Sequence, residues 1–279
     1  MMRATMYGVV GFLVVFLLSC GPTGPQPGTP EWCWQAAQDT FAAGDYLKCD
    51  EHLGRLTEVG NPFADRAFPF RLILTAGLAS GYMDIADAFE RGSRANKVLT
   101  AQFRKYMNDY RALANRRAVS FAEVFLRFQQ AKLEGDVQIA FGFPRGNPMP
   151  VADLAKISEG VLLREAALEA AEKAAIERRI LLTTCELLGA GEDVAKAQKL
   201  FTDTGATVPQ ATFLLGIAQR MKALSELYAP HELDQPERQK LLVEKALEVL
   251  KGLPETGESK KLAKELEGTL AKIRKRLGQ

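Results

Sequence analysis

The chain has 279 residues, enough for one large domain or two modest ones with a substantial core. Lysine and arginine total 36 against 34 aspartates and glutamates, so no global field attracts nucleic acid or acidic ligands. Apolar residues make up 47% of the chain, and charged residues are interspersed among alanines and leucines. This pattern predicts helices packed on helices, an all-α fold with few strand-like segments.

The N-terminal segment has the layout of an export signal. Arg3 and the amino terminus supply positive charge, residues 7–18 carry no charge, and the small residue Ser19 follows. The apolar run is shorter than the roughly 20 residues that a membrane-spanning helix needs. We therefore expect residues 1–19 to be a cleaved signal peptide.

The end of this leader, Leu17-Leu18-Ser19-Cys20, resembles the lipobox of bacterial lipoproteins. The resemblance implies that a diacylglycerol is joined to the Cys20 thiol, that the leader is cut before it, and that the new amino group is acylated. Two or three acyl chains hold a protein on a membrane durably, whereas one does so marginally. Gly21 follows in place of aspartate, which in this family implies sorting to the outer membrane, facing the periplasm. The alternative is a plain secretory signal in which Cys20 is incidental.

Residues 20–29 are expected to form a tether between the lipid and the folded body. Three glycines and three prolines within residues 21–29 exclude a helix or a strand. In a polyproline-like state this segment reaches about 28 Å, at roughly 3.1 Å per residue. The folded body is therefore expected to lie close to the bilayer.

Residues 30–134 are predicted to form an N-terminal helical part that begins with a hairpin. A helix starts at Pro30, Gly44 breaks it, and residues 47–59 return antiparallel to it. The hairpin resembles a tetratricopeptide repeat, on the residues Trp34, Ala37, Phe41, Gly44-Asp45-Tyr46, Cys49 and Leu53. A weaker echo follows at Gly191-Glu192-Asp193, Ala195, Ala197 and Leu200, at a distance that is not a multiple of 34 residues. The resemblance implies antiparallel hairpins forming an irregular repeat-like solenoid or bundle.

Two more helices are expected over residues 70–91 and 96–134, and the second carries two aromatic faces. One face consists of Phe103, Tyr106 and Tyr110, and the other of Phe121, Phe125 and Phe128. Such stripes either fill a core or line a groove for an apolar ligand. The arginines between them are interpreted as solvated faces, because an exported protein does not meet nucleic acid.

Residues 135–150 interrupt the helices. Three glycines and three prolines separate Phe141, Phe143 and Met149, which predicts an extended loop with room for a short strand. Two interpretations stay open: the apolar side chains tuck onto neighbouring helices, or the loop docks a partner. The candidate contact residues of the whole chain are Phe103, Tyr106, Tyr110, Phe121, Phe125, Phe141 and Phe143.

Residues 151–279 are predicted to form a C-terminal helical part. Helical stretches are expected over 151–188 and 208–228, and another after a capped start at Asp234-Gln235-Pro236-Glu237. A final helix after Ser259 carries the apolar stripe Leu262, Leu266, Leu270, Ile273 and Leu277. Its basic end, Lys272, Arg274, Lys275 and Arg276, suits the cap of a solenoid, with contact to anionic lipid as the alternative.

The sequence carries no recognisable catalytic or metal-binding motif. His52 and His231 lack metal-ligand spacing, and nucleophile elbows, phosphate-binding loops and dinucleotide fingerprints are missing. We therefore expect no enzyme, no metal and no cofactor. Cys33 and Cys49 lie about one helical turn out of register in a regular hairpin, which favours two buried thiols over a disulfide and leaves Cys185 unpaired.

Together these features predict a membrane-anchored, periplasm-facing scaffold that binds another envelope protein or a peptide. A competing hypothesis comes from residues 72–128, which faintly resemble helical lipoproteins associated with periplasmic solute transporters. That family has a helical body enclosing an apolar pocket or channel. An enclosed apolar cavity beside residues 103–128 would favour the transport role, and an open concave face would favour the adaptor.

Overall fold

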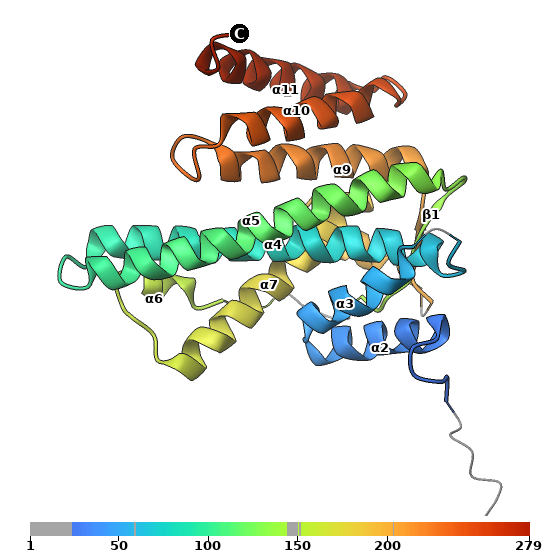
Figure 1. Cartoon of the computed structure of the whole chain (residues 1–279), viewed down its shortest axis with the longest axis horizontal. Helices are drawn as coiled ribbons and strands as arrows, with labels where there is room; N and C mark the ends of the chain where they lie inside the picture. The colour runs from blue at the N-terminus through green and yellow to red at the C-terminus, as the bar shows by residue number, and fades with distance from the viewer. Residues whose placement is uncertain (1–23, 59, 144–149, 151, 203) are drawn as a thin grey trace, which may run out of the picture.

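The computed structural model describes residues 24–58, 60–143, 150, 152–202 and 204–279 (Figure 1). Cys20 lies outside the described residues, as does the predicted leader. In chain order the elements are α2 Pro30–Ala43, α3 Tyr46–Leu56, α4 Ala64–Ala95, α5 Thr100–Ala131, β1 Val137–Ile139, α6 Leu154–Ser158, α7 Glu165–Leu187, α8 Val194–Gln198, β2 Ala206–Val208, α9 Gln210–Ser225, the 3-10 turn η1 Glu226–Tyr228, α10 Pro236–Lys251 and α11 Gly257–Arg276. The all-α prediction is confirmed.

The first hairpin forms as the sequence predicts. Thr29 caps α2 by accepting a hydrogen bond from the Trp32 backbone N–H, and Pro30 occupies the first turn. Gly44 ends α2 in the left-handed region, with φ of 78°, where a side chain would be strained. Asp45 then caps α3 by accepting from the Lys48 N–H. The chain therefore reverses within two residues.

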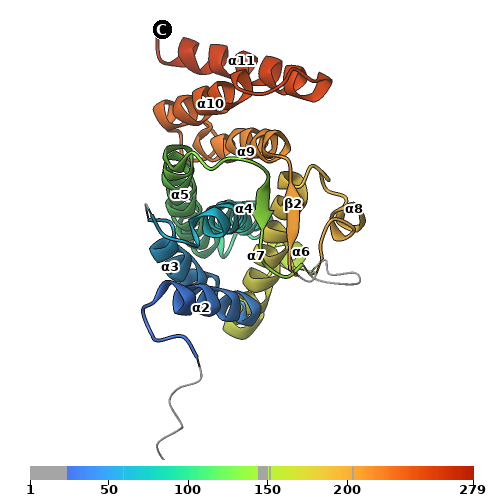
Figure 2. The ribbon, with the colours of Figure 1, turned by 90° about the vertical axis from the view of Figure 1, so that its right-hand side faces the viewer.

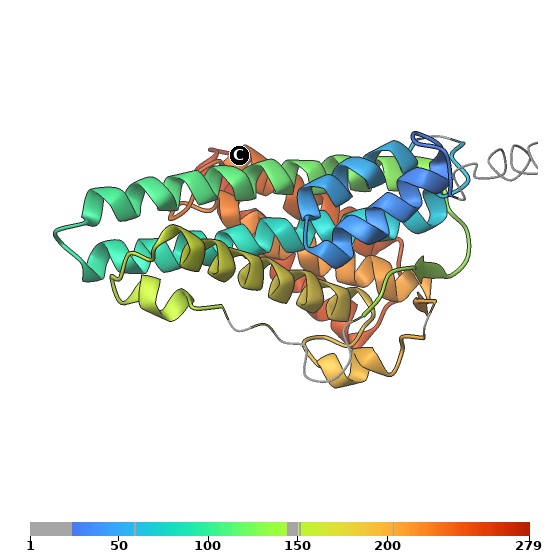
Figure 3. The same ribbon diagram turned by 90° about the horizontal axis from the view of Figure 1, so that it is seen from below.

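Helix α4 is the centre of the fold. It contacts α3, α5, α6, α7 and α9, and α5 runs along its whole length (Figure 3). Among the described residues, α4 is the one helix long and apolar enough to cross a membrane, but 83% of that apolar window is buried within the protein. Its apolar character is therefore accounted for by its place in the core.

Two glycines let α7 cross α4 closely. A Cβ placed on Gly77 would lie 2.7 Å from the Cα of Ile180, and one on Gly81 would lie 2.9 Å from the Cα of Ile176. Both distances are shorter than van der Waals contact between carbon atoms. The close packing of α7 thus depends on the absence of side chains at these two positions.

Two predicted helices are wrong in extent. Residues 151–188 do not form one helix, because Gly160 takes a φ of 89° and separates α6 from α7. The helix expected over residues 208–228 starts later than predicted, because Val208 belongs to β2, which pairs antiparallel with β1 and places Val208 opposite Val137. The helix begins only at Gln210, after Pro209. The short strand expected within residues 135–150 is present as β1.

The second repeat echo and one predicted cap also differ from expectation. Residues 191–200 contain only the five-residue α8 and form no helical hairpin. At the start of α10, Asp234 has a φ of 51° and its carboxylate accepts a hydrogen bond from Arg276 on α11, so it caps nothing. Helix α11 begins at Gly257, two residues before the predicted start at Ser259. Thr256 and Ser259 form a reciprocal capping box there.

The C-terminal helices extend the fold in one direction. Helices α9, α10 and α11 stack one upon another, while α2 and the start of the described chain lie at the opposite end (Figures 1 and 2). One hydrophobic core nevertheless runs from Cys33 on α2 to Ile273 on α11. The two helical parts on either side of residues 135–150 therefore share a core.

Candidate functional site

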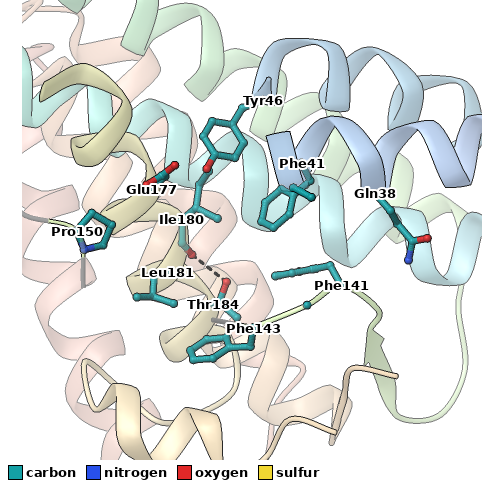
Figure 4. Close-up of a pocket in the computed structure, with 12 residues that line it drawn as sticks. Gln38, Phe41, Tyr46, Phe141, Phe143, Pro150, Glu177, Ile180, Leu181 and Thr184 are labelled. Atoms are coloured by element: carbon teal, nitrogen blue, oxygen red, sulfur yellow. Dashed lines mark hydrogen bonds between the residues drawn. The ribbon is translucent and has the colours of Figure 1, made fainter. Parts of the chain in front are cut away.

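A partly open pocket of about 530 Å³ lies between the α2–α3 hairpin, the segment after β1, and α7 (Figure 4). This volume falls within the range typical of ligand sites. We call it the aromatic pocket, and it is lined by Gln38, Phe41, Ala42, Tyr46, Phe141, Gly142, Phe143, Pro150, Glu177, Ile180, Leu181 and Thr184.

Stacked phenylalanines form one wall of the aromatic pocket. Phe141 stacks on Phe70 of α4 with ring centroids 4.5 Å apart, and its centroid lies 5.2 Å from that of Phe41. Phe143 stacks on Phe201 at 4.7 Å. Phe141 follows β1 by two residues, so the pairing of β1 with β2 sets where this wall begins. The wall thus joins segments that are far apart in the sequence.

Few polar groups line the pocket. The Thr184 hydroxyl donates to the Ile180 carbonyl at 2.8 Å, so its hydrogen is used within α7. Burial, with the nearby Glu177 carboxylate, raises the pKa of the Tyr46 phenol, which therefore stays protonated. Lys173 lies 3.9 Å from Glu177 and donates to the Ala43 carbonyl, linking α7 to the end of α2. Gln38 is a further polar lining residue, whereas the Glu177 carboxylate already interacts with Lys173 and Tyr46.

The lining suits the binding of a molecule with an apolar part. None of the described lining residues is a cysteine, histidine, serine or lysine, and the threonine hydroxyl is occupied. Aromatic and aliphatic walls favour an apolar group, while Glu177 and Tyr46 favour a hydrogen-bond donor or a cation at one side. A hydrophobic side chain beside a polar backbone or amine has this character.

Two of the predicted contact residues line the pocket, and five do not. Phe141 and Phe143 lie in its wall, with Phe141 buried and Phe143 half-buried. The other five belong to helix packing: Phe103, Tyr106, Tyr110, Phe121 and Phe125. Phe89 of α4 contacts three of them, stacking on Tyr106 and Tyr110 at 5.0 and 5.7 Å. The aromatic faces of α5 therefore fill the core, and the cavity lies elsewhere.

Sequence reasoning missed the contribution of α7 to the site. Ile180 and Leu181 look like ordinary apolar positions of a helix, and Tyr46 resembles a turn residue. Only the tertiary arrangement shows that they meet the phenylalanines after β1. The one available signal was the aromatic content of the long loop, which pointed to Phe141 and Phe143.

A second cluster joins three carboxyl groups around an arginine. The carboxylates of Asp87, Glu90 and Glu232 lie within 4.8 Å of one another, and Arg111 forms ion pairs with Glu90 at 3.1 Å and Glu232 at 2.6 Å. Burial, with Glu232 nearby, raises the pKa of Asp87 to about 6. The guanidinium already supplies positive charge here, so the cluster reads as a structural ion network that ties α4 to α5 and the η1–α10 connection.

The three described cysteines are buried and unpaired, as the sequence analysis favoured. Burial raises the pKa of the Cys49 thiol to about 12 and that of Cys185 to about 11. The thiolate is the reactive form of cysteine, so these two thiols are poor nucleophiles.

Comparison with protein-family models, with curated proteins and with solved structures finds no match for this chain.

Proposed function

We propose that this protein is a lipoprotein, attached through Cys20 to the outer membrane and facing the periplasm, whose helical body binds an apolar segment of an envelope protein or peptide. The observation that carries the binding role is the aromatic pocket, an apolar recess of about 530 Å³ walled by Phe41, Phe141 and Phe143. The anchor rests on the lipobox Leu17-Leu18-Ser19-Cys20.

The pocket offers both affinity and orientation. Burying one large apolar side chain yields roughly 1.5–3 kcal/mol, so one or two anchors of this kind give useful affinity. The carboxylate of Glu177 and the amide of Gln38 can hold the polar backbone or an amine of the same segment. The ligand therefore combines apolar bulk with a hydrogen-bond donor.

The position of the pocket along α2 fits an anchored protein. The tether leads directly into Thr29, and Phe41 lies twelve residues further on, about 18 Å along the helix at 1.5 Å per residue. The same helix thus continues the tether and supplies part of the pocket. A segment bound there is held within a short reach of the membrane.

A second candidate function is an accessory lipoprotein of a periplasmic solute transporter that binds an apolar small ligand. The volume and apolar walls of the aromatic pocket favour it, because they suit a small molecule as well as a side chain. The pocket does not lie beside residues 103–128, where this hypothesis expected a cavity.

Site-specific photo-crosslinking in the native envelope tests the proposal. A photoreactive residue at Gln38 on the pocket rim is compared with one at Gln102, an exposed position on α5 that does not line the pocket. We expect a discrete protein adduct from position 38 alone, weakened by Phe143→Glu. Equal adducts from both positions would contradict the binding site. An apolar molecule that is extracted from purified wild type, but not from Phe143→Glu, would instead support the transport role.

A further inference from the structure

The outer face of α11 carries an unusual row of lysines. Successive residues of a helix turn by about 100°, which places Lys261, Lys264, Lys272 and Lys275 within an arc of about 80°. We call these four residues the lysine stripe. The buried residues Leu262, Leu266, Leu270 and Ile273 occupy the opposite side and face α10. All four lysines are exposed and the stripe runs for about 21 Å, with Lys261 at its edge, where it also lines a groove against α9.

The lysine stripe has no ionic partners among the described residues. Other basic residues near it do: Lys260 pairs with Glu255, Arg274 with Glu244, and Arg276 with Asp234. Glu258 and Glu265 line the same groove as Lys261. Glu258 accepts a hydrogen bond from Gln219 of α9, and Glu265 pairs with Lys222 of α9, although the charge of Lys261 also lowers the pKa of Glu265. The remaining positive charge of the helix is thus concentrated on one exposed face.

The helix dipole accounts for only half of this charge. Lys272 and Lys275 lie near the C-terminus of α11, where the partial negative charge stabilises cations. Lys261 and Lys264 lie in the N-terminal half, where the dipole gives them no such benefit. Their placement on the same face as the other two therefore calls for a different explanation.

The middle of the lysine stripe carries only small residues. Gly268 and Ala271 occupy the same face between the two lysine pairs, and a Cβ placed on Gly268 would meet no heavy atom within 4 Å. A glycine inside an exposed helix costs about 1 kcal/mol relative to alanine. Elsewhere in this chain, Gly77 and Gly81 occur where another helix crosses at short range. Gly268 offers the same close approach to a partner.

We propose that the lysine stripe is a docking surface for a helix that carries carboxylates, which crosses α11 at Gly268 and pairs its acidic residues with the two flanking lysine pairs. The two pairs have the same sequence spacing in either chain direction, so a parallel or an antiparallel helix fits. This surface is separate from the aromatic pocket and does not depend on it.

Two observations favour a protein helix over a lipid surface. No large apolar residue of α11 is exposed beside the lysines, so the helix has nothing to insert into a bilayer. The stripe also lies at the end of the molecule opposite α2 and the start of the described chain (Figures 1 and 2). A protein anchored through that start presents α11 away from its own membrane.

The test uses the full mature chain and a synthetic helical peptide whose glutamates follow the spacing of the four lysines. A peptide of the same composition, with its glutamates spread around the helix, is the control ligand. Lys264→Glu/Lys272→Glu changes the stripe, and Lys245→Glu/Lys260→Glu makes the same change of net charge outside it. We expect the stripe variant to lower affinity for the patterned peptide by at least about tenfold and the control variant by less than about threefold.

Gly268→Leu separates a docked helix from general attraction of anions. This change should lower the affinity for the patterned peptide at least about fivefold, because the leucine side chain blocks the close approach of a helix. The affinity for poly-glutamate should stay unchanged, because every charge is kept. Equal affinity for the two peptides would overturn the proposal. So would tighter binding to phosphatidylcholine vesicles containing about one-third phosphatidylglycerol, lost in the stripe variant, which would assign the surface to lipid. Self-association lost in the same variant would assign it to a second copy.

Discussion

The ring of Phe141 stacks on that of Phe70, with centroids 4.5 Å apart and planes inclined by 25°. Phe70 belongs to the buried face of α4, so this contact fastens the segment after β1 onto the central helix. Phe143, two residues further on in the same wall of the aromatic pocket, stacks on Phe201 and is half-buried. The two phenylalanines therefore differ in how much of each ring is available to the pocket.

Exchanging these two phenylalanines for alanine should separate their effects on stability and on binding. Phe141→Ala removes a buried ring and should lower the free energy of unfolding by about 3–5 kcal/mol. Phe143→Ala should cost less than about 1.5 kcal/mol but weaken the crosslink from position 38, because its ring is partly exposed within the pocket wall. Urea unfolding of both variants measures the first effect. Equal losses of stability would contradict this division.

Asp50 holds three helices together through buried charge. Its carboxylate accepts from Arg71 of α4 at 2.8 Å and from Arg117 of α5 at 2.9 Å, and it is 7% exposed. Asp50→Ala leaves two guanidinium groups without their partner and should cost about 3–5 kcal/mol of unfolding free energy. Glu255→Ala, which removes an exposed pair with Lys260, should change it by less than about 1 kcal/mol. If chemical denaturation gives similar losses of unfolding free energy for Asp50→Ala and Glu255→Ala, the ion pairs of Asp50 contribute little to stability.

Glycine-to-alanine changes at two helical positions should have opposite signs. A Cβ on Gly77 would lie 2.6 Å from Cγ1 of Ile180, so Gly77→Ala must push α7 from α4 and should cost about 1–3 kcal/mol. Gly268→Ala places a methyl group in open space and should stabilise the protein by about 0.5–1 kcal/mol. Thermal unfolding of the two variants measures both changes in stability. A stabilising effect of Gly77→Ala would contradict the close packing of α7 on α4.

Asp87 should make stability depend on pH. Burial, then the charges of Glu232 and Asp84, raise its pKa to about 6, against the opposing charges of Arg91 and Arg111. The folded state therefore holds this proton more tightly than the unfolded state, so the contribution of Asp87 to stability falls as pH rises from about 4 to about 6. Asp87→Asn removes that penalty and, discounted for solvent screening, should gain about 1–2 kcal/mol at pH 8.

The same variant provides its own control at low pH. Below about pH 3 Asp87 is mostly protonated in both the folded and the unfolded state, so wild type and Asp87→Asn should there unfold at nearly the same urea concentration. An advantage of equal size below about pH 3 and at pH 8 would mean that the carboxyl group does not titrate in this range.

The helices were largely predictable because their local signals agree with their packing. Thr29-Pro30 and Gly44 set the limits of α2, and the apolar stripe of α11 faces α10 as its periodicity required. The failures lie where a tertiary partner decides. Val208, expected to begin a helix, ends strand β2 because β1 offers it an edge to pair with. The helix expected from residue 151 breaks at Gly160 because that glycine takes a left-handed conformation.

The candidate site was predictable only in part. Phe141 and Phe143 stood out because long irregular loops are often functional, whereas Ile180 and Leu181 follow the ordinary pattern of a buried helix. The faces of Phe103 and Phe121 looked equally suitable for a ligand, but the neighbouring helix α4 covers them. Periodicity identifies an apolar face without showing what covers it.

The proposed attachment at Cys20 is the part of the account that would place the aromatic pocket in the cell envelope. Metabolic labelling with a radioactive or clickable fatty acid, in cells that produce the full chain, tests it directly. Wild type and a Cys33→Ala control should incorporate label equally and fractionate with the outer membrane, while Cys20→Ala should incorporate none. Equal labelling of wild type and Cys20→Ala, or no labelling of either, would contradict the lipid anchor.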